Sequence, residues 1–196
     1  MQTIIAPVPI DPHTNLYFET YILGNSFTWN FSSTETKGPI MDKPCPTKWC
    51  RAPVFTHTLV QRTDPKIKQG KAVSAHWDLI KSVFDRWMLQ QEMTAPYIYR
   101  AVINLSLHQP FDHSEPHVDH AWSHKNWIWY LDTMDAPTLL FDEDLNITER
   151  IPCVKNTAAV FDGRLHAQSY ASPCTARRVV VITFGDDPGD QSQVQS

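Results

Sequence analysis

A histidine-rich segment, HSEPHVDHAWSH, covers residues 113–124 and holds the densest chemistry of the chain. Its side chains suited to a metal are His113, His117, Asp119, His120 and His124. One interpretation takes the four histidines together, because their spacings of 4, 3 and 4 would line one face of a helix as a zinc site. Pro116 lies inside this window and disfavours a helix there.

A second interpretation takes only His117 and Asp119 from this segment. Residues i and i+2 of a β-strand point to the same side, so this imidazole and this carboxylate would face one metal together. The third ligand would be His166, which follows the apolar run TAAVF and a turn at Asp162-Gly163. Two histidines and one carboxylate leave three coordination positions open, which suits Fe(II) and O2 chemistry. The set therefore predicts an iron oxygenase whose metal ligands are also its catalytic residues.

A pair of arginines opens the last apolar run, ARRVVVITF. In a strand, Arg177 and Arg178 would point to opposite faces, so only one of them can face a barrel interior. A buried arginine requires an anion, and its planar fork matches a carboxylate through two parallel hydrogen bonds. 2-Oxoglutarate offers such an anion, since its C5 carboxylate would pair with arginine while its keto-acid end binds iron. We favour Arg178 for this role because it directly precedes the apolar run, with Arg177 as the alternative.

The elements that must position these side chains change in character along the chain. Ser74–Met93 is predicted to be a helix, since its apolar residues recur at helical spacing and Pro96 ends it. Two strands are predicted before it, at Leu16–Leu23 and Ser26–Phe31, and residues 32–53 are predicted to form a long surface loop. Short runs rich in β-branched and aromatic residues follow the helix, at 97–107, 126–131, 138–141, 157–161 and 177–184.

Short strands at regular spacing predict a mainly β protein, as a sandwich, barrel or jelly roll, with one flanking helix. We expect a single domain over residues 1–186, which is long enough to bury a substantial core. Within it, residues 1–96 would form an irregular N-terminal part that carries the helix, and residues 97–186 would form the β core. The polar tail at 187–196 is expected to be disordered.

Composition and charge exclude several classes of protein. A formal net charge of −4 disfavours a general binder of nucleic acid or anionic membranes. No apolar run reaches the roughly 20 residues that span a bilayer, and the N-terminus lacks a signal-peptide pattern, so a cytoplasmic protein is expected. Cys45 and Cys50 are spaced like half a zinc site, but Cys153 and Cys174 are too far apart to complete it. Reduced thiols are therefore favoured.

Together these motifs resemble the 2-oxoglutarate/Fe(II) dioxygenase superfamily, in particular its prolyl-4-hydroxylase-like branch. The similarity covers Tyr97–Phe184. EPHVDHAW resembles the H-x-D loop of the family, and WIWYLDTMDAPTLLFDED resembles a pair of its strands. IPCVKNTAAVFDGRLHAQSY resembles the segment that carries the second histidine, and ARRVVVITF resembles the closing strand.

The resemblance implies a double-stranded β-helix, the jelly-roll or cupin-like core. It assigns iron to His117, Asp119 and His166, and the C5 carboxylate of 2-oxoglutarate to Arg178, with Tyr130 as a further hydrogen-bond donor to that carboxylate.

Two departures from the family pattern concern the cosubstrate pocket. Ala136-Pro137 stands where the family has a glycine pair. The tyrosine often found on the strand before the H-x-D loop is missing, so Asn104 or His108 would take its place near the C1 end of 2-oxoglutarate.

The expected activity is that of an iron- and 2-oxoglutarate-dependent dioxygenase. It would consume O2 and 2-oxoglutarate, release succinate and CO2, and hydroxylate a C–H bond of a peptide, by analogy a prolyl residue, or of a small molecule. Ascorbate is expected to support turnover by keeping the iron reduced. The prime substrate stays unidentified, and nucleobase demethylation is disfavoured by the acidic charge balance. The alternative is a non-catalytic metal-binding jelly-roll module with a binding or structural role.

Overall fold

The computed structural model describes residues 1–32, 49–50, 53–62, 67–170 and 175–189. Its main sheet has eight strands in the order β1-β11-β8-β13-β6-β4-β2, with β5 paired to β4. These strands are β1 (Ile4–Pro7), β2 (Asn30–Ser32), β4 (Val54–Gln61), β5 (Lys71–Ala72), β6 (Tyr97–Leu107), β8 (Lys125–Tyr130), β11 (Thr157–Asp162) and β13 (Ala176–Gly185). All pairs of neighbouring strands in this sheet are antiparallel.

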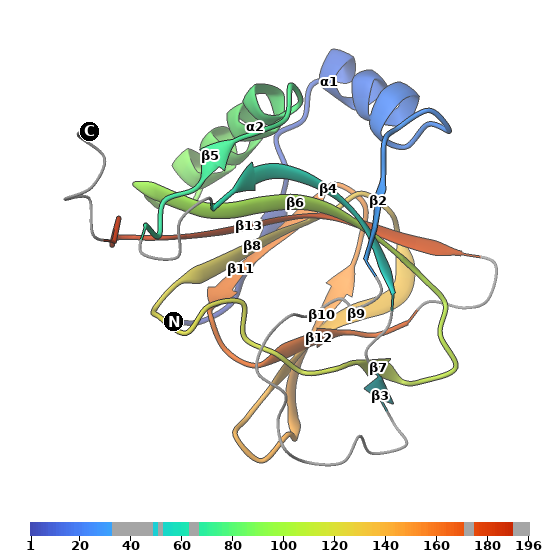
Figure 1. The fold of residues 1–196 in the computed structure, drawn as a ribbon, viewed down its shortest axis with the longest axis vertical. Helices are drawn as coiled ribbons and strands as arrows, with labels where there is room; N and C mark the ends of the chain where they lie inside the picture. Colours follow the sequence, from blue (N-terminus) through green and yellow to red (C-terminus); the bar gives the residue numbers. More distant parts are fainter. Residues whose placement is uncertain (33–48, 51–52, 63–66, 171–174, 190–196) are drawn as a thin grey trace.

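A three-stranded minor sheet faces the main sheet from the side opposite the helices (Figure 1). Its strands are β9 (Met134–Phe141), β10 (Ile147–Cys153) and β12 (His166–Gln168), in the order β10-β9-β12. An apolar cluster fills the space between the sheets and includes Ile128, Tyr130, Leu140, Ile151, Ala159, Phe161 and Val179. Two sheets packed face to face around this core confirm the jelly roll expected from the sequence. A short parallel pair, β3 (Trp49–Cys50) with β7 (His113–Ser114), lies beside the minor sheet.

Side chains along the central strands alternate between the interior of the jelly roll and the face that the helices cover. On β13, Val179 belongs to the cluster between the sheets, whereas Val180 and Ile182 pack on the opposite face. On β8, Tyr130 points between the sheets and Trp129 points to the helix side. The odd positions of β13 and the even positions of β8 therefore form the interior wall.

The helices cover the outer face of the main sheet, where α2 (Trp77–Gln90) and α1 (Pro12–Tyr17) lie on the same side (Figure 1). Residue Phe84 of α2 packs its ring against Trp127, and Trp87 packs nearby with ring centroids 6.2 Å apart. The predicted helix at 74–93 is confirmed, although it is shorter at both ends.

The predicted strand at Leu16–Leu23 is wrong, because this segment is helical. Asp11 caps α1 by accepting a hydrogen bond from the Thr14 backbone N–H at 2.9 Å, and proline follows it at the first helical position. The chain continues as a π-helix, η1 (Phe18–Ile22). Thr14, Phe18 and Ile22 are the buried positions, so burial repeats every four residues and not every two.

The N-terminal part is also less irregular than expected. β1 pairs with β11, and β4 pairs with β6, so both strands extend the main sheet. The predicted strand at Ser26–Phe31 is reduced to β2, which begins only at Asn30. Three sequence-based expectations lie outside the described residues. They concern most of the predicted loop at 32–53, the cysteines Cys45 and Cys174, and tail residues 190–196.

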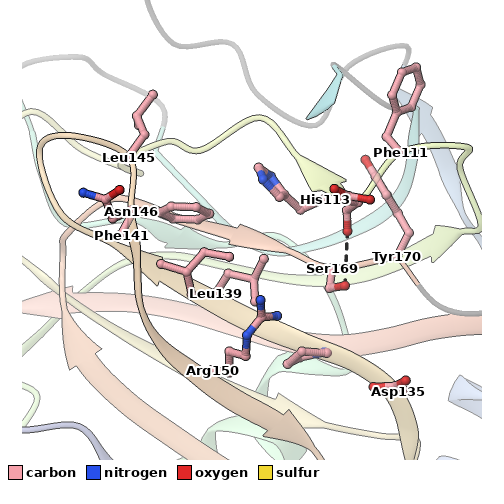
Figure 2. Close-up of a pocket in the computed structure, with 13 residues that line it drawn as sticks. Phe111, His113, Asp135, Leu139, Phe141, Leu145, Asn146, Arg150, Ser169 and Tyr170 are labelled. Carbon is pink, nitrogen blue, oxygen red and sulfur yellow. Dashed lines mark hydrogen bonds between the residues drawn. The ribbon is translucent and has the colours of Figure 1, made fainter. Parts of the chain in front are cut away.

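A pocket of about 720 Å³ lies on the outer face of the minor sheet (Figure 2). Outward-pointing side chains of β9 such as Leu139 and Phe141 form its floor, and Phe111, His113 and Tyr170 stand over it. The interior of the jelly roll lies on the other side of the sheet, so this pocket is separate from the metal centre described below. No helix in the described part of the chain is long and apolar enough to cross a membrane.

Candidate metal centre

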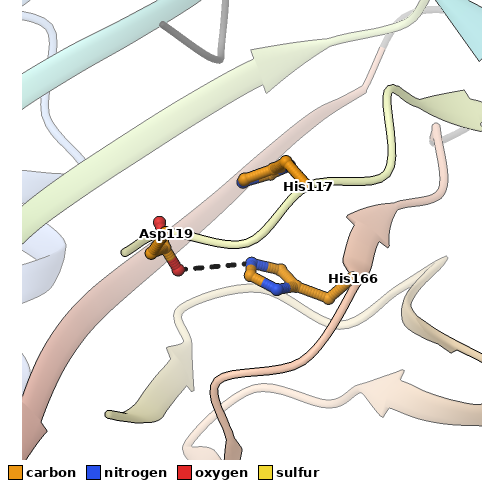
Figure 3. Close-up of side chains that lie close together, drawn as sticks. All are labelled: His117, Asp119 and His166. Atoms are coloured by element: carbon orange, nitrogen blue, oxygen red, sulfur yellow. Dashed lines mark ion pairs between the residues drawn. The ribbon is translucent and has the colours of Figure 1, made fainter. Parts of the chain in front are cut away.

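His117, Asp119 and His166 converge on one point between the two sheets (Figure 3). One potential ligand atom from each residue lies within 4.8 Å of the others. The two histidines are held together by their own backbones, since each backbone N–H donates to the carbonyl of the other at 2.9 Å. His166 begins β12, and His117 lies just beyond β7, so the bridge joins the H-x-D segment to the edge of the minor sheet.

Backbone carbonyls fix the orientation of both imidazoles. Nδ1 of His117 lies 3.0 Å from the Glu115 carbonyl, and Nδ1 of His166 lies 2.9 Å from the Arg164 carbonyl. A carbonyl can only accept, so each Nδ1 carries a proton, and Nε2 is the nitrogen whose lone pair can bind a metal. This tautomer is the one that a histidine ligand uses when a neighbouring group orients it.

The Asp119 carboxylate is largely buried and faces this lone pair. Its Oδ2 lies 3.4 Å from Nε2 of His166 and has no hydrogen-bond partner among the described residues. Burial alone would raise the pKa of Asp119, but the nearby His166, His117 and Arg100 outweigh it and hold the pKa well below its usual range. Burial lowers the pKa of His166 to about 4, and His117 adds to this effect against the opposing charge of Asp119.

These protonation states make the centre suitable for a divalent cation. Near neutral pH, a carboxylate and an imidazole lone pair would face each other across 3.4 Å with no proton between them, which is repulsive unless a cation joins them. Two imidazoles and one carboxylate match Fe(II) in type and number and leave further coordination positions open.

The alternative zinc set of four histidines is not assembled. Residues 113–124 form no helix, and the rings of His120 and His124 contact each other with centroids 4.8 Å apart but do not join the group of three potential ligands. His113 lines the outer pocket, His120 contacts Thr183 Oγ1 at 2.8 Å, and Nδ1 of His124 contacts the Trp122 carbonyl at 2.7 Å. Cys153 is a buried free thiol and is not part of the potential ligand group found among the described residues.

Arg177, and not Arg178, points into the jelly roll, so the sequence-based preference for Arg178 as the inward residue was wrong. Arg177 is 5% exposed and shares its face of β13 with Val179. Arg178 lies on the helix side, where Nε and Nη2 donate to the two carboxylate oxygens of Asp132 at 2.9 and 2.7 Å. Nη1 of Arg178 also donates to the carbonyl of Leu23.

A polar group surrounds Arg177 inside the otherwise apolar interior. Its guanidinium donates to Gln168 Oε1 at 3.0 Å, to Thr138 Oγ1 at 2.8 Å and to the Ala136 carbonyl at 3.1 Å. The Tyr130 hydroxyl donates to Thr138 Oγ1 at 2.8 Å, and burial raises the pKa of Tyr130 to about 12 despite the nearby guanidinium. No carboxylate in the described residues pairs with Arg177, so its positive charge is buried among neutral groups.

Sequence reasoning did not identify Thr138, Gln168 or Ser106, which complete this polar group. The signal for Gln168 was available, because it lies two residues after His166 on the same strand and so shares its face. Ser106 donates to Gln168 Oε1 at 2.9 Å from the end of β6. Asn104 lies opposite Val179 and points to the same interior, where its Oδ1 is buried and has no hydrogen-bond partner among the residues that the structure describes. His108 lies just beyond the end of β6.

Gly163 controls how closely the turn before His166 packs. A methyl group at this position would overlap the buried His124 ring, and the Gly163 backbone N–H donates to the His124 carbonyl at 2.8 Å. We expect Gly163→Ala to lower the free energy of unfolding by about 1–3 kcal/mol through overpacking. Urea unfolding of the metal-free protein measures this, and an unchanged midpoint would show that the His124 ring moves aside freely.

Neither a family model nor a curated protein matches the sequence, but solved structures match the fold. A 2OG-Fe(II) oxygenase family protein from Burkholderia pseudomallei matches with a TM-score of 0.67 and 14% identity over 95% of this chain and 86% of that one. A prolyl hydroxylase from Trichoplax adhaerens matches with a TM-score of 0.58 and 9% identity over 94% and 83%. The α-ketoglutarate-dependent epimerase SnoN from nogalamycin biosynthesis matches with a TM-score of 0.54 and 9% identity over 94% and 78%. The chain therefore has the fold of the 2-oxoglutarate/Fe(II) oxygenases.

Proposed function

We propose that this protein is a non-haem Fe(II) dioxygenase that uses 2-oxoglutarate to oxidise a C–H bond. The observation that carries the proposal is the pairing of two features on the same interior surface. One is the set of three ligands that requires a cation, and the other is Arg177, a buried cation that requires an anion. 2-Oxoglutarate satisfies both, because one end is a metal chelator and the other end is a carboxylate.

Each residue then has a defined task. His117, Asp119 and His166 would hold Fe(II), which supplies the activation of O2 and the oxidative decarboxylation of 2-oxoglutarate to succinate and CO2. Arg177 would pair with the C5 carboxylate, and the Thr138 and Tyr130 hydroxyls beside it would add hydrogen bonds. Arg178 would act only structurally, through Asp132.

The interior between these two ends supports a cosubstrate of this length. Gln168 contacts Arg177 and lies two residues from His166 on β12, a separation of roughly 7 Å along a strand. Val179, Leu140 and Ile128 line the same interior and would keep water away from the reacting groups. A peptide prolyl residue or a small molecule is the proposed target of hydroxylation, by analogy with the prolyl hydroxylases that share the fold.

Metal depletion and reconstitution test the proposed activity. We expect chelator-treated protein to form no succinate from 2-oxoglutarate and O2, and Fe(II) with ascorbate to restore slow turnover even without a prime substrate. Zn(II) should bind without restoring it, because zinc has no redox chemistry. A visible charge-transfer band from anaerobic Fe(II) and 2-oxoglutarate reports binding separately from turnover. Binding without succinate would favour the non-catalytic metal-binding module, and the absence of both would remove the proposal.

A further inference from the structure

A layered stack of side chains stands next to the metal ligand Asp119. The Arg62 guanidinium lies 4.6 Å from the centre of the Trp122 ring, and Trp122 stacks on His120 with ring centroids 4.7 Å apart and planes 13° from parallel. His120 directly follows Asp119 and is fixed by its contact with Thr183 Oγ1. The stack therefore places a positive charge at a defined position beside the centre.

A second cation, Arg100, lies even closer to the metal ligands. It is opposite Thr183 in the pairing of β6 with β13, and its Nη1 is 3.7 Å from Asp119 Oδ1. Its side chain is 40% exposed, so Arg100 stands at the opening of the site and not in its sealed interior. Asp119 is its only ion-pair partner among the described residues.

Neither guanidinium has an acidic partner of its own among the described residues once a metal is bound. Asp119 would then divide its single negative charge between the cation and Arg100. Arg62 makes no ion pair in the described structure, and its Nη1 is buried without a hydrogen-bond partner. A divalent metal and the Arg100 guanidinium would share the single carboxylate of the centre, and Arg62 adds a positive charge behind Trp122 and His120. The opening would therefore be strongly positive in a chain whose net charge is −4.

We propose that the opening of the metal centre binds an anionic group of the prime substrate, a carboxylate or a phosphate, on Arg100 with Arg62 as the second cation. This inference rests on the proposed function and gives the substrate its chemical class. The site is distinct from that for 2-oxoglutarate, because Thr183, beside Arg100, is six residues along β13 from Arg177, roughly 20 Å in a strand.

Anion binding to the loaded protein tests the proposal directly. Protein saturated with Mn(II) and 2-oxoglutarate under anaerobic conditions is titrated by calorimetry with inorganic phosphate in one arm and with acetate in the other. We expect saturable binding of at least one anion, and the tighter arm identifies the substrate group. Arg100→Gln should weaken this binding by about tenfold or more, and Arg100→Lys should retain most of it.

The matched control is Arg86→Gln, which changes an arginine of similar exposure on α2. Among the described residues, its side chain pairs with Asp11 and donates to the Ser82 carbonyl. It should leave anion affinity unchanged. Arg62→Gln should weaken the affinity less than Arg100→Gln does. Equal affinity in wild type and Arg100→Gln would mean that the anion binds the metal alone and would overturn the proposal, as would the absence of binding in both arms.

Separate titrations keep this proposal apart from the proposed function. Arg100→Gln is expected to bind Mn(II) at least as tightly as wild type, since it removes a positive charge beside the metal. Failure of the wild-type protein to bind Mn(II) or 2-oxoglutarate would refute the oxygenase function. Normal binding of both, without anion binding that depends on Arg100, would refute only the proposed substrate class.

Discussion

Replacing Arg177 by glutamine should strongly weaken the binding of 2-oxoglutarate to the metal-loaded protein, whereas Arg178→Gln should leave that binding intact. Arg177 is buried with only neutral partners, so a carboxylate that reaches it gains a charge-assisted pair in a poorly screened interior. Loss of one partner from such a pair costs about 2–5 kcal/mol, which corresponds to a decrease in affinity of at least about 30-fold. Calorimetry with Mn(II)-loaded protein under anaerobic conditions measures it.

Arg178→Gln is a matched control because the two residues are adjacent and undergo the same change. Its partner Asp132 lies on the helix side of the sheet, so we expect some loss of thermal stability but no change in cosubstrate affinity. The reverse result, with affinity lost in Arg178→Gln and kept in Arg177→Gln, would restore the assignment favoured from the sequence.

Substitution of His166 by alanine should remove tight metal binding, while His113→Ala should preserve it. His166 provides one of three ligands and is the histidine closer to Asp119, so its loss leaves a site with only two ligands. We expect the affinity for Fe(II) or Mn(II) to fall by about 100-fold or more, and succinate formation to fall with it. Competition against a metal-binding dye measures the affinity, and circular dichroism verifies the fold.

His113 belongs to the same histidine-rich segment but lines the pocket on the outer face of the minor sheet (Figure 2). Its Nδ1 contacts the Ser114 carbonyl at 2.7 Å, away from the three ligands. A loss of metal affinity in His113→Ala equal to that in His166→Ala would contradict the assignment of the triad and revive a centre built from several histidines.

The grouping of the three proposed metal ligands could be predicted from the sequence for two reasons. The spacing of His117 and Asp119 works in any extended segment, and the position of His166 after a strand and a turn matched a known family pattern. Which of the two arginines points inward depends on whether the odd-numbered or the even-numbered residues of β13 face the interior. A shift of one residue exchanges the two faces of a strand, and nothing in ARRVVVITF distinguishes the faces, because apolar residues occupy both.

The strands and the helix that sequence patterns did not predict carry weak or misleading local patterns. β10, with the sequence ITERIPC, lies at the edge of the minor sheet and buries only Ile151 and Cys153, while Glu149 interrupts the alternation of apolar residues. β12 has three residues, too few to show a pattern. The signal for helix α1 was the Asp11 cap and the proline after it. The apolar and aromatic residues that follow favour a strand by composition alone.

The paired backbone hydrogen bonds between His117 and His166 also bear on how readily a metal binds. Both ligands sit on one hydrogen-bonded bridge, so the two imidazoles already lie side by side before a metal arrives. Little conformational freedom is lost on binding, and this pre-organisation favours the bound state. A bound ion would in turn stabilise the bridge, so the metal-loaded protein should open along this edge of the minor sheet less often than the metal-free protein.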